Sequence, residues 1–148
     1  MQEFYESEFM IETEVPQGEL IISRTDLKGN ITYANDTFSQ ISGYKSEELV
    51  GKSHNIVRHP DMPKSVFSDM WRKLKREAKW EGIVKNLRKD KGYYWVYANI
   101  SGVFKDDVLV EYKSIRTPIS FEEKLKAQKN YDEICNRDGE NIRKVVYN

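Results

Sequence analysis

Three expected β-strands follow one another between residues 82 and 117, separated only by short charged turns. The strands are Gly82–Arg88, Tyr93–Phe104 and Val108–Thr117, and the turns are Lys-Asp-Lys-Gly at 89–92 and Lys-Asp-Asp at 105–107. Connections this short join antiparallel strands, because parallel neighbours require a crossover of roughly a dozen residues or more. This segment therefore restricts the fold to one built on an antiparallel sheet.

Two shorter strand patterns, at residues 20–25 and 31–34, come earlier and flank a turn that contains Gly29. Short helices are expected after Asn35 and after Ser46, because both residue types cap helix N-termini. A longer helix is expected over residues 64–77, where apolar residues recur at helical spacing: Val66, Phe67, Met70, Trp71 and Leu74.

Ser120 and Glu123 form a capping-box pattern for a last helix, which we expect to end near Asn136 with Phe121, Leu125 and Tyr131 along one side. The order of elements predicts an α+β domain: a five-stranded antiparallel sheet with short helices covering one face. Along the chain we expect a flanking segment at 1–18, the domain at 19–120, and a C-terminal helix and tail at 121–148.

The charge of the chain is balanced, with 24 Lys and Arg against 24 Asp and Glu. A nucleic-acid partner is not expected, because proteins that bind nucleic acids present a basic surface. The one cysteine, Cys135, cannot form an intrachain disulfide, which fits a reducing compartment. No apolar run approaches the roughly 20 residues that span a bilayer, and residues 1–16 hold five glutamates and no base. We therefore expect a cytoplasmic protein whose only association with a membrane comes through a partner.

The polar run from His54 to Pro63 is the strongest candidate for a binding site. It places both histidines of the chain, Arg58 and Asp61 within eight residues. Its two prolines disfavour regular helix before them, so the run is expected to be an irregular segment that either faces water or lines a ligand. A metal site is not favoured, because two histidines five positions apart do not share a helical face and no cysteine is near.

Residues 19–120 resemble the PAS domain of the Aer-type receptors of aerotaxis and energy taxis. The matching blocks are Ile31–Phe38, Ser42-Gly43-Tyr44, His54–Pro63, Asp69-Met70-Trp71, Trp80–Asn86, Tyr94-Trp95-Val96 and Ser114–Thr117. The run His-Asn-x-x-Arg-His-Pro-Asp-Met-Pro is the most specific of them.

The resemblance implies a PAS fold and a noncovalently bound FAD. Carried over by position, the expected cofactor contacts are Asn35, His54, Arg58, His59, Asp61, Trp71, Trp80 and Asn86. It also implies a redox sensor rather than an enzyme, similar to the soluble PAS half of a split energy-taxis receptor. Its expected partners are a separate membrane-linked chemotaxis transducer and, through the segments that flank the domain, a second copy of the chain.

The residue types suit a flavin on chemical grounds. Tryptophans can stack on a flat ring, Asn86 can both donate and accept at its polar edge, and Arg58 and His59 can meet a phosphate or a negative charge. Other interpretations stay open. Asn35 is by default a helix cap, Trp71 is as suited to the core as to a cofactor, and Trp95 favours the core. A cofactor-free docking module, and a haem or other small-ligand site with His54 or His59 as axial ligand, are the alternatives.

Overall fold

The computed structural model describes residues 11–140, and the parts of the two flanking segments at 1–10 and 141–148 lie outside the described residues. The elements, in chain order, are β1 (Ile21–Thr25), β2 (Ile31–Ala34), α2 (Asp36–Ser42), α3 (Ser46–Leu49), the 3-10 helix η1 (His54–Val57), α4 (Lys64–Glu77), β3 (Lys79–Leu87), β4 (Tyr93–Lys105), β5 (Val108–Thr117) and α5 (Phe121–Asp138). Within residues 11–140, no helix is both long and apolar enough to cross a bilayer.

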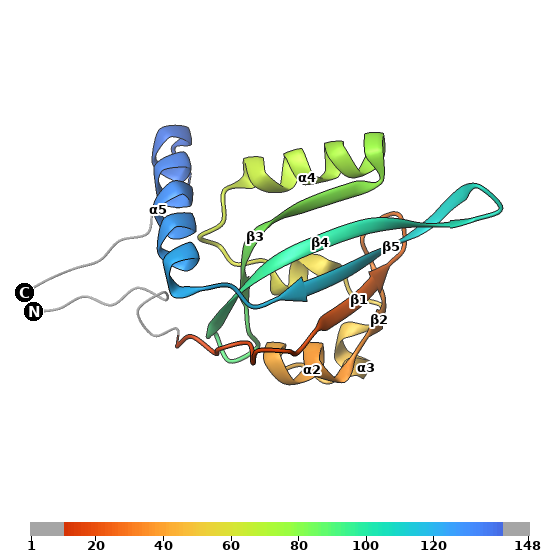
Figure 1. Ribbon diagram of the computed structural model, residues 1–148, viewed down its shortest axis with the longest axis horizontal. Helices are drawn as coiled ribbons and strands as arrows, with labels where there is room; N and C mark the ends of the chain where they lie inside the picture. Colours follow the sequence, from red (N-terminus) through yellow and green to blue (C-terminus); the bar gives the residue numbers. More distant parts are fainter. Residues whose placement is uncertain (1–10, 141–148) are drawn as a thin grey trace, which may run out of the picture.

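The five strands form one antiparallel sheet in the order β2-β1-β5-β4-β3 (Figure 1). The expected α+β architecture is therefore confirmed. β3 begins at Lys79, three residues before the expected start, because its ladder with β4 continues through Trp80 opposite Ile100 to Lys79 opposite Ser101. The β4–β5 hairpin projects well beyond the rest of the sheet (Figure 1).

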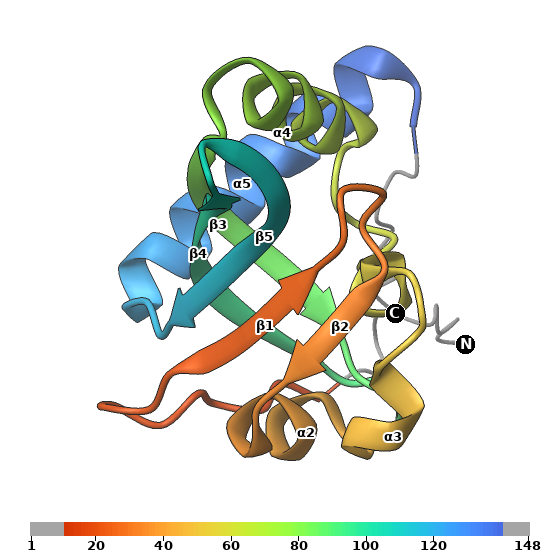
Figure 2. The ribbon, with the colours of Figure 1, turned by 90° about the vertical axis from the view of Figure 1, so that its right-hand side faces the viewer.

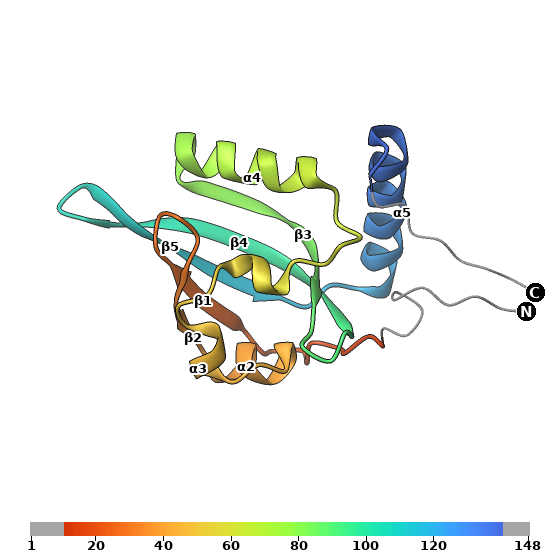
Figure 3. The ribbon, with the colours of Figure 1, turned by 180° about the vertical axis from the view of Figure 1, so that it is seen from behind.

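Side chains alternate between the two faces of the sheet. The inner face is covered by the short helices and α4, as seen from behind in Figure 3, while Figure 2 shows α2 and α3 beside β2. Fully buried apolar residues lie between these layers, among them Ile21, Phe38, Leu49, Tyr94 and Val96. This layer of helices over one face creates the space in which a ligand pocket can form.

Local capping explains where the short helices begin and end. The Asn35 side chain accepts a hydrogen bond from the backbone of Phe38 at 3.0 Å, and Gly43 ends α2 in the left-handed region at φ +80°. Asn35 is thus the cap that its residue type predicted. The expectation that Ser46 caps α3 is wrong, because Lys45 occupies the cap position and Glu48 accepts the Lys45 backbone N–H instead.

The last helix, α5, packs on the outer face of the sheet, where the Tyr131 ring stacks on Trp95 with centroids 6.4 Å apart. Its capping box is confirmed, but it runs to Asp138, where Gly139 ends it. The expected apolar side is wrong: Phe121 and Leu125 are 70% and 56% exposed. Leu125 and Tyr131 are six residues apart, about 240° around a helix, so they cannot share a face. The buried residues of α5 are Lys124, Ala127, Tyr131 and Cys135.

Candidate functional site

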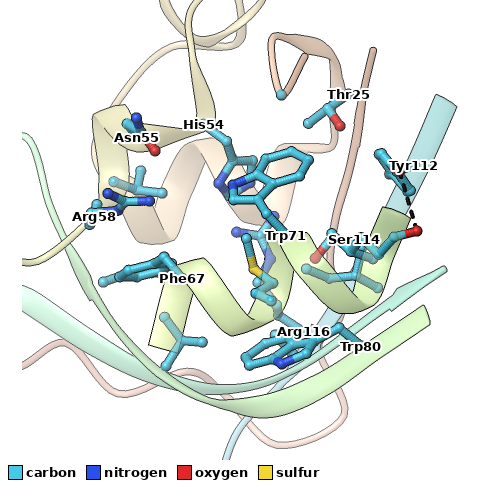
Figure 4. Close-up of a pocket in the computed structure, with 18 residues that line it drawn as sticks. Thr25, His54, Asn55, Arg58, Phe67, Trp71, Trp80, Tyr112, Ser114 and Arg116 are labelled. Atoms are coloured by element: carbon cyan, nitrogen blue, oxygen red, sulfur yellow. Dashed lines mark hydrogen bonds between the residues drawn. The ribbon is translucent and has the colours of Figure 1, made fainter. Parts of the chain in front are cut away.

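A pocket lies between the inner face of the sheet, η1 and α4 (Figure 4). It contains about 730 Å³ of space free of protein atoms, part of it open to solvent. The lining residues are Thr25, Gly29, His54, Asn55, Val57, Arg58, Phe67, Met70, Trp71, Leu74, Trp80, Val84, Asn86, Ala98, Ile100, Tyr112, Ser114 and Arg116. Five of the eight predicted contacts are among them: His54, Arg58, Trp71, Trp80 and Asn86.

Two indole rings form walls of the pocket, and each depends on a glycine. Trp71 lies against Gly29 in the β1–β2 turn, where a Cβ would come within 3.0 Å of the ring. Trp80 lies over Gly82 of its own strand, where a Cβ would come within 2.5 Å of the ring. Trp95 does not line the pocket and packs under α5, as its preference for the core predicted.

Arg58 lies with Phe67 on one side of the pocket, opposite Tyr112 and Ser114 (Figure 4). Its guanidinium carbon is 3.9 Å from the centre of the Phe67 ring, and its backbone pairs with Asn86 on β3. The Nε atom is buried without a hydrogen-bond partner, and burial lowers the pKa of the guanidinium. Arg58 Nε is thus a hydrogen-bond donor without a protein partner, and Asn86 lines the same pocket.

Arg116 is a second arginine of the pocket, only 2% exposed. Its Nη2 donates to Ser23 Oγ at 2.7 Å and its guanidinium lies over Phe38, whereas Nε and Nη1 are buried without partners. Burial lowers its pKa from 12.5 to about 10. The lining contains both arginines and neither Asp nor Glu, so the pocket favours a ligand rich in acceptor atoms or negative charge.

The sequence reasoning did not include Arg116 among the site residues, although it lies in a block on which the resemblance rests. The usable signal was strand alternation: Ser114 and Arg116 are polar residues at alternate positions of β5, on the face that also holds Tyr112. Buried polar residues on one face of a strand need partners, which is a reason to look for a site there.

His54 lines the pocket as a neutral imidazole. Its Nε2 is 3.4 Å from Ser23 Oγ and its ring stacks on Phe38 at a centroid distance of 5.7 Å. Burial, with the nearby charge of Arg116, lowers its pKa to about 3. An uncharged ring nitrogen can donate or accept according to its tautomer.

The remaining three predicted contacts, Asn35, His59 and Asp61, lie outside the lining of this pocket. Besides capping α2, Asn35 joins it to the start of β1 by accepting from the Ile22 backbone and donating to Leu20 O. His59 is fully buried, and burial lowers its pKa to about 4. Its Nδ1 accepts the Asp61 backbone N–H at 3.0 Å, so it carries no proton there and the 3.8 Å approach of the Asp61 carboxylate is not an ion pair.

The Asp61 carboxylate instead pairs with Lys85 Nζ at 3.0 Å. Cys135, the one cysteine of the chain, lies on α5 beside the Asp61 backbone and does not line the pocket. Across the part of the chain that the structure describes, no three His, Cys, Asp or Glu residues come together as metal ligands would.

Comparisons with known proteins agree with this architecture. Residues 31–116 match a family described as the PAS fold. The chain is 52% identical over 103 residues to the aerotaxis receptor of Escherichia coli (strain K12), covering 70% of this chain and 20% of the receptor. It is 33% identical over 91 residues to a nitrogen fixation regulatory protein of Klebsiella pneumoniae, covering 62% of this chain and 18% of that protein. The chain thus spans about a fifth of these curated relatives.

Among solved structures, the PAS domain of a protein from Colwellia psychrerythraea superimposes with a TM-score of 0.62 at 24% identity, covering 68% of this chain and 86% of that domain. The order and pairing of the strands, the helices over one face, the pocket beneath them and the family match lead to one conclusion: this chain belongs to the PAS domain family.

Proposed function

We propose that this chain is a non-enzymatic PAS redox sensor of energy taxis, which binds FAD noncovalently in the pocket and passes its state to a separate membrane-linked chemotaxis transducer. The support from comparison is 52% identity with a protein named as an aerotaxis receptor. The support from the structure is the chemistry of the pocket.

The observation that carries the proposal is a pair of arginines, Arg58 and Arg116, whose guanidinium groups hold buried N–H donors without partners, in a pocket that has tryptophan walls and no carboxylate. A buried donor without a partner costs about 1–3 kcal/mol, and more when it is charged. A bound ligand that supplies acceptors recovers this cost. FAD suits a pocket with unpaired donors and tryptophan walls, because it combines a flat aromatic ring with acceptor atoms at one ring edge and an anionic diphosphate.

Five of the predicted contacts would hold the cofactor directly. Trp71 and Trp80 would flank its apolar surface, Asn86 would donate and accept at a polar edge, and Arg58 would meet an acceptor or a negative charge. The neutral His54 would add a donor or an acceptor. Arg116 is our addition to this set. FAD would supply electron transfer, while the protein would set its potential and respond to its charge.

We assign Asn35, His59 and Asp61 to indirect roles in the same site. Asn35 joins α2 to β1 beneath Phe38, the residue against which both His54 and Arg116 pack. His59 and Asp61 hold the segment that follows Arg58. Their substitution is expected to weaken cofactor binding by displacing Arg58 and its neighbours rather than by removing a contact.

The test is an absorption spectrum of protein purified in the presence of FAD, recorded before and after anaerobic dithionite. Flavin bands that bleach on reduction are expected. Arg58→Ala should lower the FAD affinity about 10- to 150-fold, the equivalent of one charged hydrogen bond of about 1.5–3 kcal/mol. Arg72→Ala is the matched control, because Arg72 is 64% exposed and pairs only with Asp69 among the ion pairs of the described residues.

Two results would contradict the proposal. A spectrum with only the aromatic band, unchanged by added FAD, would favour the cofactor-free docking module. A Soret band would favour haem with His54 as the axial candidate, since His54 lines the pocket and His59 does not.

A further inference from the structure

The end of the molecule opposite α5 is formed by the C-terminal end of α4 and the tip of the β4–β5 hairpin (Figures 1 and 3). The two meet at Gly102, whose backbone N–H donates to Ala78 O at 2.8 Å. Among the described residues, β3 pairs with β4 only as far as Ser101, and β1 pairs with β5 only as far as Tyr112. Residues 102–111 therefore form a two-stranded ribbon that continues beyond the rest of the sheet and past the end of the helix.

This ribbon exposes large apolar side chains. Phe104, Val108 and Val110 are 57%, 61% and 43% exposed. A Cβ on Gly102 would lie 2.9 Å from Ala78 Cβ and 3.2 Å from Phe104 Cε2, so the Phe104 ring lies on the side of the ribbon from which α4 packs. A two-stranded ribbon is at best marginally stable in water by itself. Covering its apolar side chains with another molecule would therefore stabilise it.

The helix end and the hairpin tip carry opposite charges. Residues 72–79 contain five bases and one acid. Three of these bases are exposed and have no ion-pair partner among the described residues: Lys73, Lys75 and Arg76. The hairpin turn instead holds Asp106 and Asp107, which are also exposed and unpaired within that part of the chain. Figure 2 looks at this end of the molecule and shows the hairpin beside α4, so a basic and an acidic surface lie next to each other.

A surface of this form is complementary to its own copy. A twofold rotation can place the ribbons of two copies face to face, with each hairpin tip at the α4 end of the other copy. Acids then meet bases at two equivalent places, and the exposed apolar side chains of both ribbons are covered. The charge of the whole chain is balanced at 24 against 24, and a net charge near zero favours association rather than repulsion.

We propose that this end, which we call the bipolar end (residues 73–76 of α4 and 102–111 of the hairpin), joins two copies of the chain in a symmetric homodimer. In it, the acidic tip of each hairpin contacts the basic end of α4 in the partner. One ribbon and one helical turn from each copy form a smaller contact than the roughly 800 Å² per partner of a standard interface. The dimer is therefore weak and sensitive to salt, and it depends neither on FAD nor on the flanking segments.

The test is sedimentation equilibrium of the full chain without added FAD, at about 5 to 500 μM. The wild type is expected to dimerise, with a Kd at least about tenfold weaker in about 500 mM than in about 50 mM NaCl, because salt screens the charge pairs. Asp106→Asn/Asp107→Asn should weaken the dimer at least about tenfold as well. Asparagine suits the left-handed backbone of both positions, at φ +51° and +63°. The control Lys126→Glu/Lys129→Glu changes two exposed lysines of α5 and should leave the Kd unchanged.

Two charge-reversed variants make the test specific. Asp106→Lys/Asp107→Lys gives the bipolar end a basic tip, and Lys73→Glu/Lys75→Glu/Arg76→Glu gives it an acidic helix end. Each should be monomeric alone, and an equimolar mixture should form a dimer with one copy of each. A wild type that stays monomeric, a dimer that ignores these charges, or a mixture that stays monomeric would each overturn the proposal. If the lysine variant fails to fold by circular dichroism, the asparagine variant decides alone.

Discussion

Replacing Arg116 by methionine should weaken FAD binding strongly and leave the stability of the ligand-free domain almost unchanged. Removing a large, fully buried side chain usually costs about 2–5 kcal/mol. Arg116 differs because its own burial is unfavourable. Its pKa falls from 12.5 to about 10, and one pKa unit is about 1.4 kcal/mol, so keeping the group charged at neutral pH costs the folded state about 3 kcal/mol.

The contacts that Arg116 makes offset this cost. The charged hydrogen bond to Ser23 is worth about 1.5–3 kcal/mol, and the guanidinium over Phe38 adds about 0.5–2 kcal/mol. The Arg116→Met variant lacks both contacts, but it also avoids the cost of burying a charge. Ser23 Oγ keeps a partner in the variant, because His54 Nε2 lies 3.4 Å away. The expected net change in the free energy of unfolding is within about 2 kcal/mol of zero.

FAD binding should respond differently, because the unused Nε and Nη1 donors exist only in the arginine. Losing one charged hydrogen bond of about 1.5–3 kcal/mol corresponds to about a 10- to 150-fold weaker affinity. Urea unfolding without ligand and a fluorescence titration with FAD measure the two effects. Arg24→Met is the control, since Arg24 is exposed and pairs with Glu111 on the outer face. A destabilisation above about 4 kcal/mol together with unchanged FAD affinity would refute the reasoning.

Two further experiments, a substitution and a change of pH, test the Trp80 wall of the pocket and the buried rings of His54 and His59. Gly82→Ala should displace the Trp80 ring, because the new Cβ would lie 2.5 Å from it; a shifted Trp fluorescence spectrum and weaker FAD binding are expected, and an unchanged affinity would remove Trp80 from the site. Burial lowers the pKa of His54 to about 3 and of His59 to about 4, so protons bind the unfolded chain first as the pH falls below 6.5. Stability is therefore expected to fall by about 4 kcal/mol between pH 7 and 5 (1.5 pH units below 6.5 for each of two histidines), above the range in which carboxylates titrate. Urea unfolding at several pH values measures it, and a flat profile over that window would show that the histidines are accessible to protons in the fold.

Local sequence signals were sufficient for most of the elements. The charged turns predicted the three-strand segment, the capping box of Ser120 and Glu123 predicted the start of α5, and the spacing of apolar residues predicted α4. These signals act within a few residues, where hydrogen bonding and steric preferences of the backbone decide the outcome. They were weaker at helix boundaries and faces, as Lys45 in the cap position of α3 and the exposed Phe121 show.

The identity of the side chains around the pocket followed partly from the resemblance, which named His54, Arg58, Trp71, Trp80 and Asn86. The resemblance could not say which of the eight residues face the pocket and which support it. His59 and Asp61 lie one and three positions after Arg58, yet the chain turns around the β3 edge there. The Asp61 carboxylate pairs with Lys85, the Asp61 backbone oxygen meets Cys135 of α5, and His59 accepts the Asp61 backbone N–H. A sequence gives the order of these residues but not the side of a strand that each one reaches.

By itself, then, the sequence determined an antiparallel α+β domain, its element order and the polar run that borders its pocket. Only the tertiary structure decided that β1 lies beside β5, which brings Ser23 to Arg116 although the two are 93 positions apart. That pairing is what buries Arg116 with two unused donors. The physical reason is that strand alternation assigns a residue to a face, while its burial and its partners depend on which distant strand and helix pack against that face.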